Sequence, residues 1–123
     1  MKKKEAAVEF LTLAGTGHIE DAYARFIAPG FIHHNPYFPG DRESLKSAMA
    51  EAHRISPNVL IDVKHAFEDG DFVITHSRIV RRDPNEPEIA VVHVFRFVGD
   101  KVVELWDVAQ LLSKDSPNEN GAF

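Results

Sequence analysis

The chain has 123 residues, of which 44% are hydrophobic and 27% are charged. Its 14 basic and 19 acidic residues give a formal net charge of −5, which argues against a nucleic-acid partner because such a partner needs a basic face. The length suits one domain with a core of its own. Cysteine is absent, which excludes disulfides, thiolate metal sites and a cysteine nucleophile.

No segment indicates a membrane span or a secretory signal. The apolar runs fall short of the roughly 20 residues that cross a bilayer. The first residues are basic, but Glu9 and Thr12 interrupt the apolar stretch that follows them. We therefore expect a cytoplasmic protein with no membrane partner.

Three helices are expected in the first half of the chain, where apolar residues recur at helical spacing. The first covers Ala7–Ala14 and ends at two glycines, and the second covers Ile19–Ile27 and ends before Pro29. Asp41 is the expected N-cap of the third helix, which ends at Ser56-Pro57.

Four strands are expected in the second half, at Val59–Glu68, Phe72–Arg82, Glu88–Val98 and Lys101–Leu112, because these segments are rich in β-branched and aromatic residues. Short turns of Asp, Gly, Asn and Pro separate them, so they must be antiparallel neighbours. Helices followed by a meander predict an α+β fold with the helices on one face of the sheet.

Strand alternation assigns side chains to the two faces of this sheet. We set the register by pairing the residues on either side of each turn. In this register His93 lies opposite His76 of the preceding strand and opposite Trp106 of the following strand. Asp107 then points to the other face, and only a β-bulge would bring it to the face of the histidines. Aromatic, aliphatic and a few polar groups share the predicted pocket face, as is typical of small-ligand sites. It carries Ile61, Val63, His65, Phe67, Phe72, Ile74, His76, Arg78, Ile89, Val91, His93, Phe95, Trp106, Val108 and Gln110.

The opposite face is too apolar to lie wholly in water, so we expect part of it to form an oligomer interface. It carries Thr75, Ser77, Val92, Val94, Val103, Leu105 and Ala109.

His76 and His93 are the predicted catalytic residues, because histidine is the commonest general acid or base near physiological pH. An apolar pocket would lower their pKa values and keep them neutral, as a base requires. The alternative is that each is a buried histidine bonded to a neighbour. A zinc site of His65, His76 and His93 is a further alternative, but no spacing motif supports it, and we expect no metal.

Other candidates would bind the substrate. His34, Asn35 and Tyr37 lie in a loop that either contacts a substrate oxygen or anchors the chain. Trp106 is a wall for a hydrophobic ligand or a core residue. Arg78 needs a carboxylate partner, from the protein or from an acidic ligand, or it lies in water at the sheet edge. No phosphate-binding loop and no serine nucleophile elbow are present.

The segments Phe31–Pro36, Val94–Phe97 and Gly99–Asp107 resemble those of the SnoaL-like polyketide cyclases, in the nuclear-transport-factor-2-like superfamily. The resemblance implies a cone-shaped barrel, in which a curved antiparallel sheet wraps around three N-terminal helices and encloses a deep pocket. It implies a domain over residues 1–112, an irregular tail over residues 113–123, a homodimer and no cofactor. The chemistry for which the family is named is an intramolecular aldol cyclisation.

The resemblance also assigns positions to functional residues. The acidic residue of the cyclases corresponds to Gln110, whose amide cannot exchange a proton at neutral pH. The Tyr, Asp base and protonated Asp of the ketosteroid isomerases fall near Phe10, Asn35 and His93. The scytalone dehydratases of the superfamily use pocket histidines, which are also present here.

We therefore expect a cofactor-independent lyase or isomerase that acts on a small hydrophobic carbonyl compound. His93 and His76 would transfer the proton, while Asn35, His34 and Gln110 would orient the substrate. Val91, Phe95, Trp106 and Val108 would shape the cavity, and a homodimer would form through the outer sheet face. The alternatives are a small-molecule-binding protein without catalysis and a protein-interaction domain of the same fold.

Overall fold

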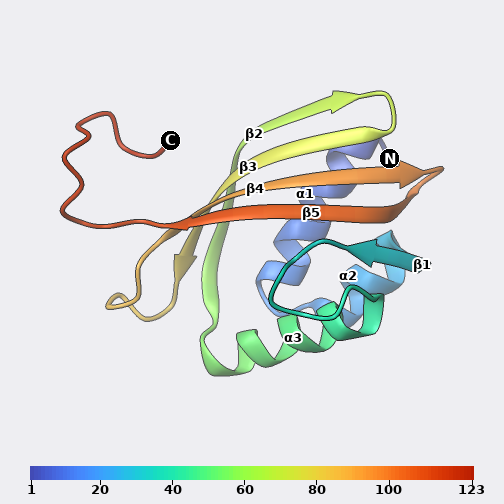
Figure 1. Cartoon of the computed structure of the whole chain (residues 1–123), viewed down its shortest axis with the longest axis horizontal. Helices are drawn as coiled ribbons and strands as arrows, with labels where there is room; N and C mark the ends of the chain where they lie inside the picture. The colour runs from blue at the N-terminus through green and yellow to red at the C-terminus, as the bar shows by residue number, and fades with distance from the viewer.

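Three helices and five strands follow one another in the computed structural model, which describes residues 1–123 (Figure 1). They are α1 (Lys3–Gly15), α2 (Ile19–Phe26), β1 (Ile27–His33), α3 (Arg42–Ile55), β2 (Asn58–Asp69), β3 (Phe72–Arg81), β4 (Ile89–Val98) and β5 (Lys101–Leu111). Residues 112–123 form turns and contain neither helix nor strand. The predicted α+β class, with three helices and a meander, is confirmed.

α1 and α3 end at the predicted signals, whereas α2 ends at Phe26, before the predicted stop at Pro29, because Ile27 already begins β1. Asp41 caps α3, because its side chain accepts a hydrogen bond from the backbone N–H of Ser44 at 3.0 Å. α1 ends at Gly15, where a Cβ would lie 2.6 Å from the side chain of Ile61, so glycine permits this close approach. None of the helices combines the length and apolarity that crossing a membrane requires.

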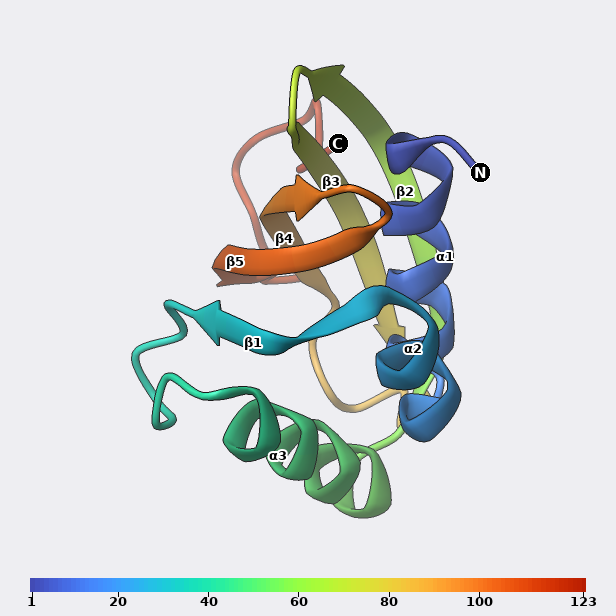
Figure 2. The ribbon, with the colours of Figure 1, turned by 90° about the vertical axis from the view of Figure 1, so that its right-hand side faces the viewer.

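The sheet has the strand order β1-β5-β4-β3-β2. β2 to β5 form the predicted antiparallel meander, whereas β1 pairs with β5 in parallel. The sheet is therefore mixed: the predicted antiparallel pairing is confirmed for β2 to β5, and β1 adds one parallel pair that was not predicted. It curves around the helices without closing into a barrel (Figure 2). α1 packs across β2 and β3, while α3 lies beside β1, so the concave face is covered unevenly.

The predicted register is wrong, because the connection from β3 to β4 shifts it by one residue. His76 lies opposite Val92, whereas His93 lies opposite Thr75. The two histidines therefore point to opposite faces of the sheet, since successive side chains alternate.

An irregularity in β2 moves a further group of predicted pocket residues. Val63 pairs with Ser77, but His65 pairs with His76, so Lys64 is an extra residue between the two pairs. Ile61 and Val63 consequently pack against the core, whereas the residues after the irregularity turn outward. The convex face includes His65, Phe67, Phe72, Ile74, His76 and Arg78.

The core lies between the concave face and the helices. Phe95 of β4 and Phe10 of α1 are fully buried and meet edge to face, with ring centroids 6.2 Å apart. Phe10 also contacts the buried ring of Tyr23 in the same manner, at 5.7 Å. These aromatic contacts join α1, α2 and the centre of the sheet.

The tail after β5 returns to the convex side of the sheet (Figure 1). The Phe123 ring lies 5.4 Å from the His76 ring, and Lys64 Nζ lies 5.8 Å from the Phe123 ring centroid. The tail thus covers part of the predicted catalytic histidine His76 on its outer side.

Because aromatic rings fill the core, alanine substitutions at two positions of β4 are expected to differ strongly in their effect on the free energy of unfolding. Replacing Phe95 with Ala is expected to lower the free energy of unfolding by about 3–5 kcal/mol, because a cavity remains among α1 and the sheet. Replacing the exposed Val98 with Ala on the same strand is expected to change it by less than about 0.5 kcal/mol. Urea unfolding measures both, and equal losses would contradict the described core.

Candidate functional site

Three polar residues form a row across the concave face. Thr75 on β3 pairs with His93 on β4, and His93 pairs with Asp107 on β5. Residues that pair in this way on antiparallel strands share a face, so all three side chains point toward the helices. His93 and Asp107 remain partly exposed, while Thr75 is fully buried.

Asp107 reaches this face because β5 contains one extra residue. Phe97 pairs with Val102, but Arg96 pairs with Glu104, so Val103 has no partner of its own. Such a bulge reverses the alternation of the residues that follow it. This is the condition under which Asp107 was expected to enter the pocket face, and the structure fulfils it.

Asn35 contacts Asp107 from the loop that follows β1. Its Nδ2 donates to Asp107 Oδ2 at 3.1 Å and lies 3.3 Å from Oδ1. Its Oδ1 accepts a hydrogen bond from the backbone N–H of Tyr37 at 3.0 Å, which fixes the amide so that only Nδ2 faces the carboxylate. The parallel pairing of His33 with Leu105 brings Asn35 alongside Asp107.

His33 holds this loop from inside, which fits the alternative that the loop anchors the chain. It is 5% exposed, and its Nε2 lies 2.6 Å from the carbonyl oxygen of Pro39. Its Nδ1 accepts from the backbone N–H of Asn35 at 3.1 Å. Because Nδ1 is the acceptor, the proton lies on Nε2, which donates to Pro39. The buried ring therefore fixes the backbone of Asn35.

The environment of His93 favours its neutral form. Burial lowers the pKa of His93 to about 4, and the nearby Asp107 carboxylate opposes this shift only in part. Its Nδ1 is buried and has no hydrogen-bond partner. At neutral pH, the ring is thus an uncharged imidazole beside a carboxylate.

Only some of the predicted site residues lie together. His93, Val91 and Phe95 share the concave face, and Val91 and Phe95 are buried there. Asn35 joins them through Asp107. Tyr37 lies at the tip of the loop, where it is 85% exposed.

The other predicted residues lie on the convex face. His76 Nδ1 is 3.2 Å from the Nδ1 of His65, which excludes a zinc site that also includes His93, because His93 is on the other side of the sheet. No group of three or more acidic or histidine side chains is arranged to hold a metal. Arg78 pairs with Glu88 through two hydrogen bonds of 2.7 Å, so its carboxylate partner comes from the protein.

β5 contributes three further convex residues of the predicted pocket. Trp106 stacks on His34 at 4.9 Å between ring centroids, and His34 Nε2 lies 2.6 Å from Glu104. Val108 is 71% exposed, and Gln110 is also exposed. The predicted placement of Trp106, Val108 and Gln110 beside His93 is therefore wrong, because the bulge at Val103 turns them outward.

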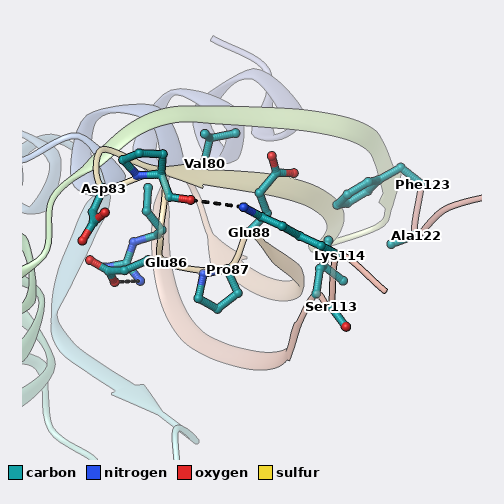
Figure 3. A pocket seen from close by; sticks show the side chains of 12 residues that line it. Val80, Asp83, Glu86, Pro87, Glu88, Ser113, Lys114, Ala122 and Phe123 are labelled. Atoms are coloured by element: carbon teal, nitrogen blue, oxygen red, sulfur yellow. Dashed lines mark hydrogen bonds and ion pairs between the residues drawn. The ribbon is translucent and has the colours of Figure 1, made fainter. Parts of the chain in front are cut away.

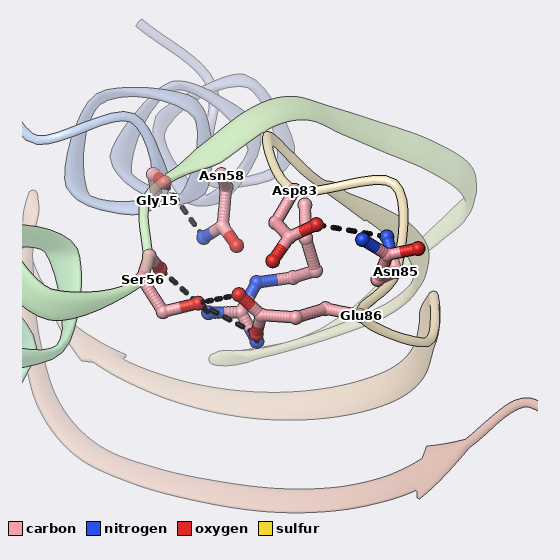
Figure 4. Close-up of polar contacts among 7 residues, drawn as sticks. Gly15, Ser56, Asn58, Asp83, Asn85 and Glu86 are labelled. Carbon is pink, nitrogen blue, oxygen red and sulfur yellow. Dashed lines mark hydrogen bonds and ion pairs between the residues drawn. The ribbon is translucent and has the colours of Figure 1, made fainter.

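A cavity of about 230 Å³ lies at the end of the concave face. Met49 and His53 of α3 line it, together with Ile79 and Ile89 of the sheet and the end of α1. At its rim, Arg81 Nη2 donates to the carbonyl oxygen of Ser56 at 2.6 Å. The Ser56 hydroxyl donates to Glu86 Oε2 at 2.6 Å (Figure 4).

A second cavity, of about 520 Å³, lies outside the concave face, between the tail and the β3–β4 connection. Its lining includes Glu88, Lys114 and Phe123 (Figure 3). Lys114 Nζ lies 3.5 Å from the carbonyl oxygen of Pro84 across this cavity. The cavity contains none of the polar row, so it belongs to a different part of the molecule.

Comparison with known proteins identifies a family and a fold. Residues 7–105 match the family described as SnoaL-like domain. No curated protein sequence matches the chain.

Several solved structures share the fold. A candidate polyketide cyclase of Acidithiobacillus ferrooxidans is 22% identical with a TM-score of 0.75, and the alignment covers 89% of this chain and 88% of the other. IdmH of Streptomyces antibioticus, a candidate polyketide cyclase, is 17% identical with a TM-score of 0.74, covering 89% and 92%. An NTF-2-like protein of unknown function from Burkholderia xenovorans is 18% identical with a TM-score of 0.71, covering 94% and 88%. These likenesses establish the nuclear-transport-factor-2-like fold, and the match over residues 7–105 shows that the chain belongs to the SnoaL-like domain family.

Proposed function

We propose that this protein is a cofactor-independent enzyme that moves a proton at a carbon next to a carbonyl group, in an isomerisation or an intramolecular aldol cyclisation. The observation that carries the proposal is the contact of Asn35 with Asp107, beside the neutral His93 on the concave face. Proton abstraction next to a carbonyl needs a base and a hydrogen-bond donor to the developing oxyanion, and a carboxylate and an imidazole can supply these two.

Asp107 is the base in this proposal, in place of the predicted His76. Its carboxylate is held by a side chain from another element and remains partly exposed, so a substrate can reach it. His93 is a poor base, because burial lowers its pKa to about 4. As a neutral ring it can instead donate a hydrogen bond to the oxygen on which negative charge develops.

The substrate class follows from the surroundings of the row. Val91 and Phe95 are apolar neighbours of His93 on the same face, so a small hydrophobic carbonyl compound suits the site better than a charged one. Two of the solved structures with this fold are candidate polyketide cyclases, which supports carbonyl chemistry. Binding of such a compound without reaction is the alternative, and the substitution of Asp107 separates the two.

Replacing Asp107 with Asn is expected to slow deuterium incorporation next to the carbonyl of a 1,3-diketone by at least about 100-fold, because the variant has no carboxylate base. Exchange is measured by NMR in deuterated buffer. Asp100→Asn is the matched control, since Asp100 lies in the exposed turn before β5 and is expected to have no effect. An Asp107→Asn variant that keeps full protein-dependent exchange would show that Asp107 is not the base. An unsubstituted protein that exchanges no faster than buffer alone would support binding without catalysis.

Protonation of His93 predicts a pH dependence of stability. The pKa of His93 is about 4 in the folded chain and about 6.5 in the unfolded chain, so the unfolded chain binds more protons between these values. The free energy of unfolding therefore decreases as the pH falls from about 6.5 to about 4. Urea unfolding across this range is expected to show a weaker decrease for His93→Gln than for the unsubstituted protein. If the free energy of unfolding fell equally with pH in both proteins, the result would contradict a buried, neutral His93 ring.

We further propose that the convex face joins two copies of the chain. Phe67 is 61% exposed there, and Val92 lies opposite the exposed Val108 at the centre of the face. Replacing Val108 with Glu is expected to convert a dimer to a monomer in analytical ultracentrifugation, because a carboxylate would be buried in the interface. A monomeric unsubstituted protein at 100 μM, or a variant that still dimerises, would refute this arrangement.

A further inference from the structure

Two histidines lie directly opposite each other on the convex face, at the side of the sheet where β2 is the edge strand. They are His65 of β2 and His76 of β3. Their Nδ1 atoms face each other at 3.2 Å, and the angle between their ring planes is only 2°. His65 is exposed and His76 is partly exposed, so the pair is open to solvent. The proposed proton transfer uses neither ring.

The extra residue in β2 creates this pair. Val63 lies opposite Ser77, so an uninterrupted ladder would place Lys64 opposite His76. The bulge at Lys64 shifts the register by one residue and brings an imidazole to this position in place of an ammonium group. Because bulges commonly re-aim side chains beside functional sites, this register indicates a role for the His65–His76 pair.

A hydrogen bond between the two rings does not by itself account for the pair. Two neutral imidazoles that meet through their Nδ1 atoms share one proton, so one ring is the donor and the other is the acceptor. At an exposed position, water competes for both groups, and the net gain from such a bond is small. The pair therefore has the capacity to bind a further group at little loss.

The separation of the two Nδ1 atoms suits a metal ion. Imidazole nitrogens bind zinc at about 2.0–2.1 Å, and two such bonds enclose an angle of about 100° at the metal when the nitrogens are 3.2 Å apart. This angle lies between those of square-planar and tetrahedral coordination. Imidazole ligands favour Zn²⁺, Cu²⁺ and Ni²⁺, whereas Ca²⁺ and Mg²⁺ prefer oxygen ligands.

The charges around the pair permit a cation to bind. Lys64 and Arg78 are the cationic residues nearest to the pair in the sequence, and each is paired with a carboxylate. Lys64 Nζ lies 2.7 Å from Asp62 Oδ2, and Arg78 makes two hydrogen bonds with Glu88. The whole chain has a formal net charge of −5, which also favours a cation over an anion.

We propose that His65 and His76 chelate a divalent late transition-metal ion, of the class of Zn²⁺ and Cu²⁺, through their Nδ1 atoms. The ring that carries its proton on Nδ1 in the free protein transfers it to Nε2, so that both Nδ1 lone pairs face the metal. Water completes the coordination, because no third acidic or histidine side chain joins the pair. The ion links the edge strand β2 to β3 and stabilises the folded chain.

Titration with Zn²⁺ in an isothermal calorimeter tests the site. One ion per chain is expected to bind, and His65→Gln is expected to weaken binding at least about tenfold, because a single imidazole remains. His18→Gln is the matched control, since His18 is exposed and its side chain makes no capping hydrogen bond, and it is expected to bind Zn²⁺ normally. Equal affinities of the His65→Gln variant and the unsubstituted protein, or no saturable binding, would overturn the inference.

Thermal unfolding checks that the His65→Gln variant folds and that the ion stabilises the sheet. In EDTA, the variant and the unsubstituted protein are expected to have similar Tm values, because His65 is exposed. Zn²⁺ is expected to raise Tm only in the unsubstituted protein. An equal rise in the variant would overturn the inference. Both measurements need no substrate, so they are independent of the proposed enzymatic function.

Paramagnetic Cu²⁺ locates the bound ion. At substoichiometric Cu²⁺, the NMR amide signals of residues 64–66 and 75–77 are expected to broaden before all others. His34 Nε2 and Glu104 Oε2 also lie close together on the sheet, at 2.6 Å, and provide the competing position. Broadening centred on His34 and Glu104 would place the ion there and would overturn the inference.

Discussion

A single extra residue in β5 determines which side chains of this strand point to the concave face of the sheet. In an antiparallel strand, each residue points to the face opposite that of its neighbour, so one insertion reverses every residue after it. The bulge at Val103 brings Asp107 inward beside His93 and turns Trp106 outward. Without it, an aromatic ring would occupy the place of the carboxylate, and neither the contact with Asn35 nor the proposed base would exist.

The loop after β1 supplies the other half of the site. Its backbone bends around the buried ring of His33, which bonds to Asn35 and Pro39 at the two ends of the loop. The amide of Asn35 is then oriented by Tyr37 and by Asp107. The polar contacts of the loop therefore depend on one another, and they hold the Asn35 amide against the Asp107 carboxylate. The hydroxyls of Thr75 and Ser77 extend this polar surface across the sheet.

The sequence was sufficient for the three helices, the four strands of the meander and the family, because capping residues, turn residues and hydrophobic spacing are local signals. It did not predict β1, which pairs with the distant β5. It was insufficient for the site. Three features moved the register: the β3–β4 connection, the extra Lys64 and the extra Val103. Each depends on contacts between strands, so none has a local signature. Asp107 was recognised as dependent on a bulge, and His93 was assigned to the site, whereas His76 and Gln110 were placed on the wrong face.

The most direct test of the account is a crystal structure of the protein with an enolic 1,3-diketone. The account predicts that the carbon between the two carbonyl groups lies within about 3.5 Å of an Asp107 carboxylate oxygen. One oxygen of the ligand is expected within hydrogen-bond distance of His93. A diketone bound on the convex face beside His76 and Trp106, or in the cavity under the tail, would contradict the concave-face site.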